Sequence, residues 1–177
     1  MSTIIKLTAL LGVLIMFNGC SSHSLKAYKD TKPTIDIKDF FSGDIKGWGI
    51  VQDRKGEVIS RFDVTMKGSW NGDIGTLDEY FTYYNGKTQT RTWTITKHED
   101  GSYTGTASDI IDKATGTQSG SAINWKYRID LPVKDSTYRM SFDDWMWQMN
   151  DGVVINRSYI KKFGITFAEL TLFMQKQ

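Results

Sequence analysis

From residue 40 to the end of the chain, apolar and polar residues alternate, and short polar turns interrupt the alternation at regular intervals. In the segment 58–67, for example, Phe62, Val64 and Met66 are apolar and the residues between them are polar. The segment 123–131 repeats the pattern. A period of two puts successive side chains on opposite faces of a β-strand. The pattern therefore predicts strands that each have one apolar face.

Most of the turns between these segments contain Asn-Gly, Asp-Gly or another glycine-containing sequence, which tolerates the positive φ of tight hairpins, and one is Lys-Asp-Ser. They lie at 53–56, 71–72, 85–86, 100–101, 113–116, 134–136 and 150–152. We therefore expect about nine strands, at 44–53, 56–70, 75–84, 87–98, 102–112, 116–131, 136–149, 152–161 and 164–176.

Short turns between consecutive strands predict an antiparallel meander, and several of the strands are long enough to be the tilted staves of a barrel. Closing the sheet removes its exposed edges. We predict an all-β protein, a single antiparallel meander β-barrel of about eight to ten strands over residues 40–177. A barrel that spans an outer membrane needs a continuous apolar outer band, whereas the outward positions here are Thr, Lys, Arg and Asp.

The first residues, 1–19, are typical of a secretory signal peptide. Lys6 and the α-amino group supply a positive start, and residues 7–17 form an apolar run that is too short to cross a bilayer as a helix. Gly19 then precedes Cys20, which is the only cysteine of the chain. This order is typical of a lipoprotein cleavage site, so we expect a signal peptide over 1–19 and acyl chains on Cys20.

The cleavage sequence Phe17-Asn18-Gly19-Cys20 departs at two positions from the usual order of Leu, a small residue, Gly or Ala, and Cys. The alternative is a leftover thiol near an ordinary cleavage site, but a lone cysteine is unusual in an exported protein. Ser21 after the cysteine favours sorting to an outer membrane. We expect a lipid anchor in the cell envelope, facing the periplasm, and a flexible polar tether over 20–39.

The composition argues against several classes of function. The net charge of +2 and the lack of a Lys/Arg cluster argue against a nucleic-acid partner. With two histidines and one cysteine we expect no metal site, and without a catalytic or phosphate-binding motif we expect no cofactor and no catalytic residue. Asp143 and Asp144 would point to opposite faces of a strand and so do not form a carboxylate pair.

Charged residues interrupt the predicted apolar faces at Glu79, Arg91, Asp144, Arg157 and Glu169. If these faces line a barrel, isolated charges would each cost several kcal/mol, so they must pair with one another or meet a polar ligand group. One interpretation is a set of salt bridges that close one end of the barrel. The other is a ligand-binding site.

In the second interpretation, Arg91 and Arg157 hold the carboxylate or phosphate head of a ligand while aromatic residues line its acyl chain. The candidate ligand-binding residues are Glu79, Arg91, Trp93, Tyr127, Asp144 and Arg157.

The tryptophans suggest further roles. Trp48, in Gly-Trp-Gly, resembles the Gly-x-Trp start of lipocalins, although the spacing differs. In that family the tryptophan packs against an arginine of a late strand, so the resemblance implies a structural role for Trp48, with Arg157 as its partner, in plugging one barrel end. Trp145 and Trp147 share a face opposite Asp144, which is either a partner- or membrane-facing patch or a face covered by a neighbouring element.

A series of short motifs runs through the whole domain. They are Trp48-Gly-Ile-Val-Gln-Asp-Arg, Leu77-Asp-Glu-Tyr-Phe, Arg91-Thr-Trp93, Asn124-Trp-Lys-Tyr127, Asp143-Asp-Trp-Met146 and Ile155-Asn-Arg157. Over residues 40–176 the chain resembles a family of small Gram-negative bacterial lipoproteins known only as a domain of unknown function. The resemblance implies a lipocalin-like β-barrel and, through the frequent proximity of lipid-modifying genes, a link to membrane-lipid metabolism. It defines no catalytic residues.

We therefore expect an outer-membrane-anchored periplasmic lipoprotein that binds or carries a hydrophobic ligand such as a fatty acid or lipid. Two alternatives stay open. A barrel filled by its own side chains would be a non-catalytic interaction module beside an envelope protein. A lipid-acting enzyme would use Asp144 or Glu79 as its acid or base. The expected partners are the membrane, through the lipid anchor, a small hydrophobic ligand and an envelope protein.

Overall fold

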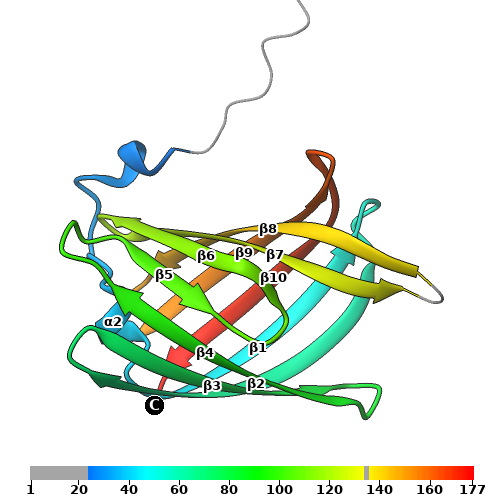
Figure 1. Cartoon of the computed structure of the whole chain (residues 1–177), viewed down its shortest axis with the longest axis horizontal. Coiled ribbons are helices and arrows are strands. Elements are labelled where there is room, and N and C mark those ends of the chain that lie inside the picture. Colours follow the sequence, from blue (N-terminus) through cyan, green and yellow to red (C-terminus); the bar gives the residue numbers. More distant parts are fainter. Residues whose placement is uncertain (1–23, 134–135) are drawn as a thin grey trace, which may run out of the picture.

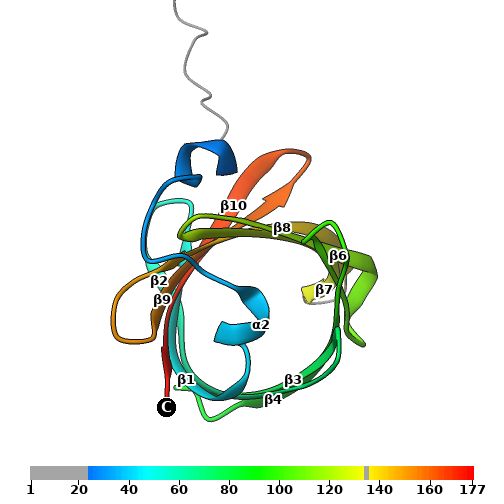
Figure 2. The ribbon, with the colours of Figure 1, turned by 90° about the vertical axis from the view of Figure 1, so that its left-hand side faces the viewer.

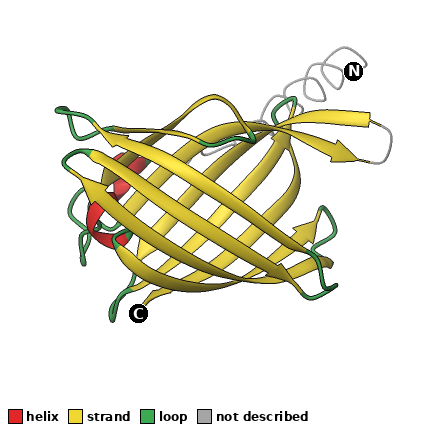
Figure 3. Ribbon diagram, turned by 60° about the horizontal axis from the view of Figure 1, so that its bottom comes forward, coloured by secondary structure: helices red, strands yellow, loops and turns green. Residues whose placement is uncertain are grey.

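The domain is a barrel of ten consecutive antiparallel strands, and the computed structural model describes residues 24–133 and 136–177. The strands are β1 (Gly43–Asp53), β2 (Val58–Asn71), β3 (Ile74–Tyr83), β4 (Thr88–Lys97), β5 (Tyr103–Thr106), β6 (Ile110–Ser119), β7 (Ala122–Val133), β8 (Ser136–Gln148), β9 (Val153–Lys162) and β10 (Ile165–Lys176). They follow one another in chain order, and β1 pairs with β10 to close the sheet (Figure 1; Figure 3). The predicted closed all-β meander is confirmed.

The alternation of side chains gives every strand an inner and an outer face. In β2, Phe62, Val64 and Met66 are buried, whereas Arg61 and Thr65 are exposed. Buried apolar residues from nearly all the strands join them in one continuous core inside the barrel. Full burial of such a side chain is worth about 1.5–3 kcal/mol, so the pattern of alternation also fixes which way each strand faces.

The main departure from the predicted strands lies between β4 and β7. We expected strands at 102–112 and 116–131 with a turn at 113–116, but the chain forms three strands there, β5, β6 and β7. The turn after β6 is at Gly120, where φ is 54°. Residues 113–116 belong to β6, which passes through a register shift as it pairs with β7.

The glycine that suggested a turn, Gly116, has a packing role instead. A Cβ at this position would overlap the indole ring of Trp125, which lies across the strand from it. Glycine in a strand interior often marks such a close approach of a neighbouring group, and composition alone does not separate this from a turn. The nearby Asp112, with φ 60°, sits in the irregular part of β6.

The N-terminal segment closes one end of the barrel. After η1 (Leu25–Tyr28), the short helix α2 (Ile37–Phe40) lies across the barrel opening (Figure 2). Ile35 and Ile37 are buried in the core. The prediction of a flexible tether over 20–39 is therefore wrong for its second half. Ile35 and Ile37 stand among polar residues, and two apolar positions are too few to show a periodic pattern in the sequence.

Polar contacts fix this segment to the barrel. The Asp36 side chain caps α2 by accepting a hydrogen bond from the Asp39 amide at 3.0 Å, and it forms an ion pair with Lys97 at 3.3 Å. The Gln118 side chain accepts a hydrogen bond from the Ile37 amide at 3.0 Å. A capped helix start that is also tied to two strands is held in one position.

The outer face around Trp145 is covered by η1. The Tyr28 ring lies 6.2 Å from the Trp145 ring, and Trp147 stacks on Trp145 at 6.5 Å. Of the two interpretations of this face, the structure favours packing under a neighbouring element.

Among the described residues, no helix is long and apolar enough to cross a membrane. The predicted signal peptide and the predicted lipid site at Cys20 lie outside the described residues.

We predict that Ile37→Ala lowers the free energy of unfolding by about 2–4 kcal/mol, because it removes buried methyl groups and leaves a cavity under α2. The control is Thr34→Ala, at an exposed position of the same segment, which should change stability by less than about 0.5 kcal/mol. Urea unfolding followed by circular dichroism measures both. Equal, small effects would show that the segment is dispensable for the fold.

Candidate ligand-binding site inside the barrel

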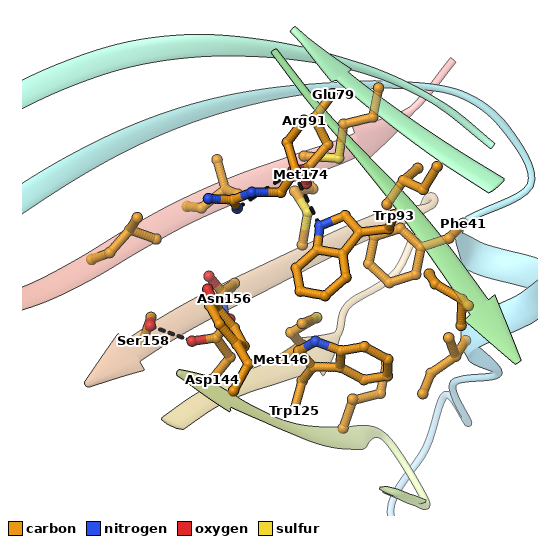
Figure 4. Close-up of a pocket in the computed structure, with 18 of the residues that line it drawn as sticks. Phe41, Glu79, Arg91, Trp93, Trp125, Asp144, Met146, Asn156, Ser158 and Met174 are labelled. Atoms are coloured by element: carbon orange, nitrogen blue, oxygen red, sulfur yellow. Dashed lines mark hydrogen bonds and ion pairs between the residues drawn. The ribbon is translucent and has the colours of Figure 1, made fainter. Parts of the chain in front are cut away.

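The barrel interior contains a cavity of about 120 Å³ beneath α2. Its walls are mostly apolar and aromatic, with contributions from Phe62, Leu77, Trp93 and Trp125. Two groups of polar side chains reach into it from opposite walls, one from β3 and β4 and the other from β8 and β9 (Figure 4). An apolar pocket with a few converging polar groups is the usual form of a small-molecule site.

The first polar group is centred on Arg91 of β4. The register of the sheet places Arg91 directly opposite Glu79 of β3, and the guanidinium Nη1 lies 3.6 Å from the Glu79 carboxylate. Arg91 Nε and Nη2 donate hydrogen bonds to the Asp109 carboxylate, at 3.1 and 2.7 Å. The Trp93 indole donates to Glu79 at 3.3 Å. Arg91 and Glu79 are only 14% and 11% exposed, so these partners replace the water that each charge loses.

The second polar group is centred on Asp144 of β8. Its carboxylate accepts a hydrogen bond from the Ser158 hydroxyl of β9, the strand paired with β8. Asn156, also on β9, donates to the backbone carbonyl of Trp145 at 3.1 Å. Tyr127 lies beside this group, stacked on Phe142 at 4.8 Å. Asp144 has no cation of its own within ion-pair distance among the described residues.

Burial controls the charge of both groups. It raises the pKa of Glu79 to about 7 despite the nearby Arg91 guanidinium, and it raises the pKa of Asp144 to about 7 despite the Ser158 and Tyr127 hydroxyls. Burial also raises the pKa of Tyr127 well above its ordinary value. A low-dielectric interior penalises the charged form of each acid. The cavity therefore contains one permanent cation and two carboxyl groups that hold their protons to higher pH than exposed carboxyl groups do.

Of the residues predicted to bind ligand, Glu79, Arg91, Trp93, Tyr127 and Asp144 do line the cavity. Their role in binding stays a prediction, but their convergence on one space was expected from their place on the apolar faces.

Arg157 was assigned to the wrong face. It lies outside the barrel, 40% exposed, and its guanidinium donates to Glu169 at 3.0 Å. The inward residues of β9 are Val154, Asn156 and Ser158, which are buried. In this strand the polar Asn156 and Ser158 point inward and the apolar Ile155 points outward, which is the reverse of the usual pattern. The inner and outer faces of β9 were therefore exchanged in the prediction. The two-arginine head-group site is thereby ruled out.

Trp48 was expected to plug one end of the barrel beside Arg157, but it lies on the outer face. It is exposed on β1, packs against Phe173 at 5.8 Å, and has the Lys46 ammonium over its ring at 5.0 Å. Glycines flank it, and a Cβ at Gly49 would overlap the Phe62 ring. These inward glycines make room for the core, which sends the tryptophan between them outward. α2, not Trp48, closes the barrel end.

Comparison with known proteins assigns the chain to a family. A family profile described as "Protein of unknown function (DUF3833)" matches residues 14–176, which include the entire barrel and the N-terminal segment that closes it. The chain belongs to this family. No curated protein matches it. The expected resemblance to a family of unknown function is confirmed, and a DUF3833 assignment by itself gives no residue a role.

Sequence reasoning missed three polar residues of this DUF3833 barrel. Asn156 and Ser158 line the cavity, and Asp109 holds Arg91 from the connection between β5 and β6. A period-two run of Val154, Asn156 and Ser158 was the only available signal for the first two. Asp109 had no signal, because it lies in a connection whose path the sequence pattern did not define.

We predict that the free energy of unfolding falls as the pH rises from about 4.5 to about 7. Over this range the folded chain keeps protons on Glu79 and Asp144, whose pKa values are near 7, whereas carboxyl groups of the unfolded chain have already lost theirs. Each group contributes up to about 3 kcal/mol to the decline, at about 1.36 kcal/mol per unit of pKa. Urea unfolding at a series of pH values measures it.

Asp144→Asn removes one titrating group and should make the decline clearly shallower. Asp130→Asn, at an exposed residue of β7, is the control and should leave the slope between pH 4.5 and 7 as it is. A slope that Asp144→Asn does not alter would mean that this carboxyl titrates normally.

Proposed function

We propose that this protein binds a small hydrophobic ligand inside its barrel and works in the cell envelope, anchored by a lipid on Cys20. The main support for ligand binding is the cavity itself, an apolar space whose lining includes the polar side chains of Arg91 and Asp144. A core evolved only for stability favours apolar residues at such positions, since replacing buried ion pairs by well-packed apolar side chains is often neutral or stabilising.

The size of the cavity limits the ligand. At about 120 Å³ it is comparable with a cavity of roughly 150 Å³ that holds one benzene molecule. It therefore accepts a single ring or a short stretch of an acyl chain. A longer chain has to continue toward the end away from α2, past the aromatic rings of Phe62, Phe81 and Tyr83, which contact one another at 5.6 to 6.5 Å.

The charges around the cavity select the polar end of the ligand. Arg91 is already held by Glu79 and Asp109, and Asp144 adds a third carboxyl group. A ligand carboxylate would meet more acids than bases. A hydroxyl or amide group can instead donate a hydrogen bond to Asp144 or Glu79. This corrects the head-group chemistry expected from sequence, and it favours a neutral long-chain alcohol or amide over a free fatty acid at neutral pH.

The location in the envelope belongs to the same proposal and rests on the sequence. Residues 1–19 have the order of a signal peptide, and Gly19-Cys20-Ser21 has the order of a lipoprotein site sorted to the outer membrane. A lipid-anchored binding protein facing the periplasm can exchange a hydrophobic ligand with the membrane that holds it.

Native mass spectrometry of the Cys20→Ser chain, which lacks the acylation site, tests ligand binding. With decanol at about pH 8 we expect one bound molecule per chain. Decanoate should bind about tenfold more weakly, a difference of about 1.4 kcal/mol, because Glu79 and Asp144 are then charged. The difference should shrink at about pH 5.5, where both are protonated. Bare masses under all conditions would contradict a carrier and support a filled barrel that acts through its exterior.

Two variants test whether the ligand binds in the cavity. Asp144→Asn removes one interior carboxylate and should raise the affinity for decanoate relative to decanol about fivefold at pH 8, a change of about 1 kcal/mol. Arg157→Met removes a charge from the outer face and should change neither affinity. If the two variants behave alike, binding occurs somewhere other than the cavity.

A further inference from the structure

The turn between β9 and β10 presents an apolar side chain to solvent. Phe163, at the tip of this turn, is 91% exposed, and two residues near the start of β10, Ile165 and Phe167, are 53% and 41% exposed. Single exposed apolar residues are common, but a run of them on one hairpin is typical of a contact surface. We call Arg54, Lys162, Phe163, Ile165 and Phe167 the turn patch.

The backbone conformation of this turn indicates that Phe163 does not stabilise the fold. Its φ is 51°, and that of Gly164 is 79°, so two consecutive residues are left-handed. Two-residue hairpin turns of this kind favour Asn-Gly, because a bulky side chain is strained at positive φ. The conformation of Phe163 therefore costs free energy, and its side chain is too exposed for burial to offset that cost. Such uncompensated strain indicates that Phe163 contacts another molecule.

Cations accompany the exposed rings. The Lys162 ammonium lies 3.8 Å from the Tyr138 ring and 5.3 Å from the Phe163 ring, and the Arg54 guanidinium lies 5.6 Å from the Phe167 ring. Two nearby carboxylates form ion pairs with other cations, Asp143 with Lys161 and Glu169 with Arg157.

The turn between β1 and β2 adds Lys55, Asp53 and Glu57. Together with Arg54 and Lys162, these residues are three cations and two acids, a net charge of +1. Asp53 is occupied in that turn, where it accepts hydrogen bonds from the Lys55 and Glu57 amides. Aromatic rings beside lysine and arginine are the side chains enriched where proteins meet the headgroup region of a bilayer, and their charge complements anionic phospholipids.

The position of the patch agrees with a membrane contact. In Figures 1 and 2 the β9–β10 turn, the β1–β2 turn and η1 all lie toward the same upper side of the barrel. Ser24, just before η1, is the first described residue, and Cys20 precedes it by four residues, which span at most about 14 Å. An anchor on Cys20 would therefore be within about 14 Å of Ser24.

We propose that the turn patch inserts into the headgroup region of an anionic phospholipid bilayer. The barrel then lies with its long axis along the membrane surface, held near η1 by the lipid on Cys20, which rests on the proposed function, and at the other end by Phe163. This contact is independent of ligand binding in the cavity. It orients the molecule, whereas an anchor at the N-terminus alone would leave the barrel free to rotate.

A fluorescent label tests the insertion at one site. In the Cys20→Ser background, Phe163→Cys provides a unique thiol for an environment-sensitive nitrobenzoxadiazole label. Asn85→Cys is the control, because the β3–β4 turn also carries an exposed aromatic residue and a lysine, Tyr84 and Lys87, but lies on the opposite, lower side in Figure 1. With vesicles of phosphatidylglycerol and phosphatidylcholine, emission at 163 should shift to the blue and at 85 should not. No shift at 163, or equal shifts, overturns the proposal.

Phe163→Asn separates binding from folding. Asparagine suits the left-handed position, so the variant should melt at a higher temperature than its parent, while its partition onto the same vesicles falls about tenfold through the loss of one apolar anchor. Tyr84→Asn is the matched control and should leave partition unchanged. Undiminished vesicle binding by Phe163→Asn, or a lower melting temperature, overturns the proposal and favours a protein contact or a purely structural role.

Discussion

The interior of this barrel depends on the ion pairs of one buried arginine. Arg91 lies between the rings of Phe81 and Trp93, at 5.9 and 5.7 Å, where an unpaired guanidinium would cost several kcal/mol. Glu79 from the neighbouring strand and Asp109 from the β5–β6 connection supply its partners. The charge can therefore stay inside the barrel, and the cavity keeps a polar centre that a purely apolar core would not have.

The same interaction completes the barrel wall. β5 has four residues and pairs with β4 only over Thr94–Lys97, so the described residues at the start of β4 have strand partners on the β3 side alone. The bond from Arg91 to Asp109 joins this part of β4 to the β5–β6 connection. The ion pair between Arg91 and Asp109 thus has two consequences. It neutralises a buried charge, and it connects the start of β4, which has no strand partner on that side among the described residues, to the rest of the sheet. At one end of the barrel, α2 lies across the opening (Figure 2), and Ile37 of this helix lines the cavity.

Much of this arrangement could be predicted from the sequence, and the failures share one cause. Alternation and hairpin turns are local signals, so they identified the closed meander and put Glu79, Arg91 and Asp144 on inward faces. They could not predict which residues of a strand point inward when its inner face is itself polar, as at Asn156 and Ser158. They also could not show that Gly116 makes room for the Trp125 ring of the neighbouring strand. Both features depend on how side chains pack in the folded sheet, which the local pattern does not encode.

Fluorine NMR of protein labelled with 5-fluorotryptophan shows whether a ligand binds in the space between the two polar groups. Trp93 and Trp125 line the cavity, whereas Trp48 lies on the outer face. On addition of decanol to the Cys20→Ser chain, we expect the resonances of Trp93 and Trp125 to shift and that of Trp48 to stay in place. Binding that moves only Trp48, or none of the three, would contradict a site inside the barrel.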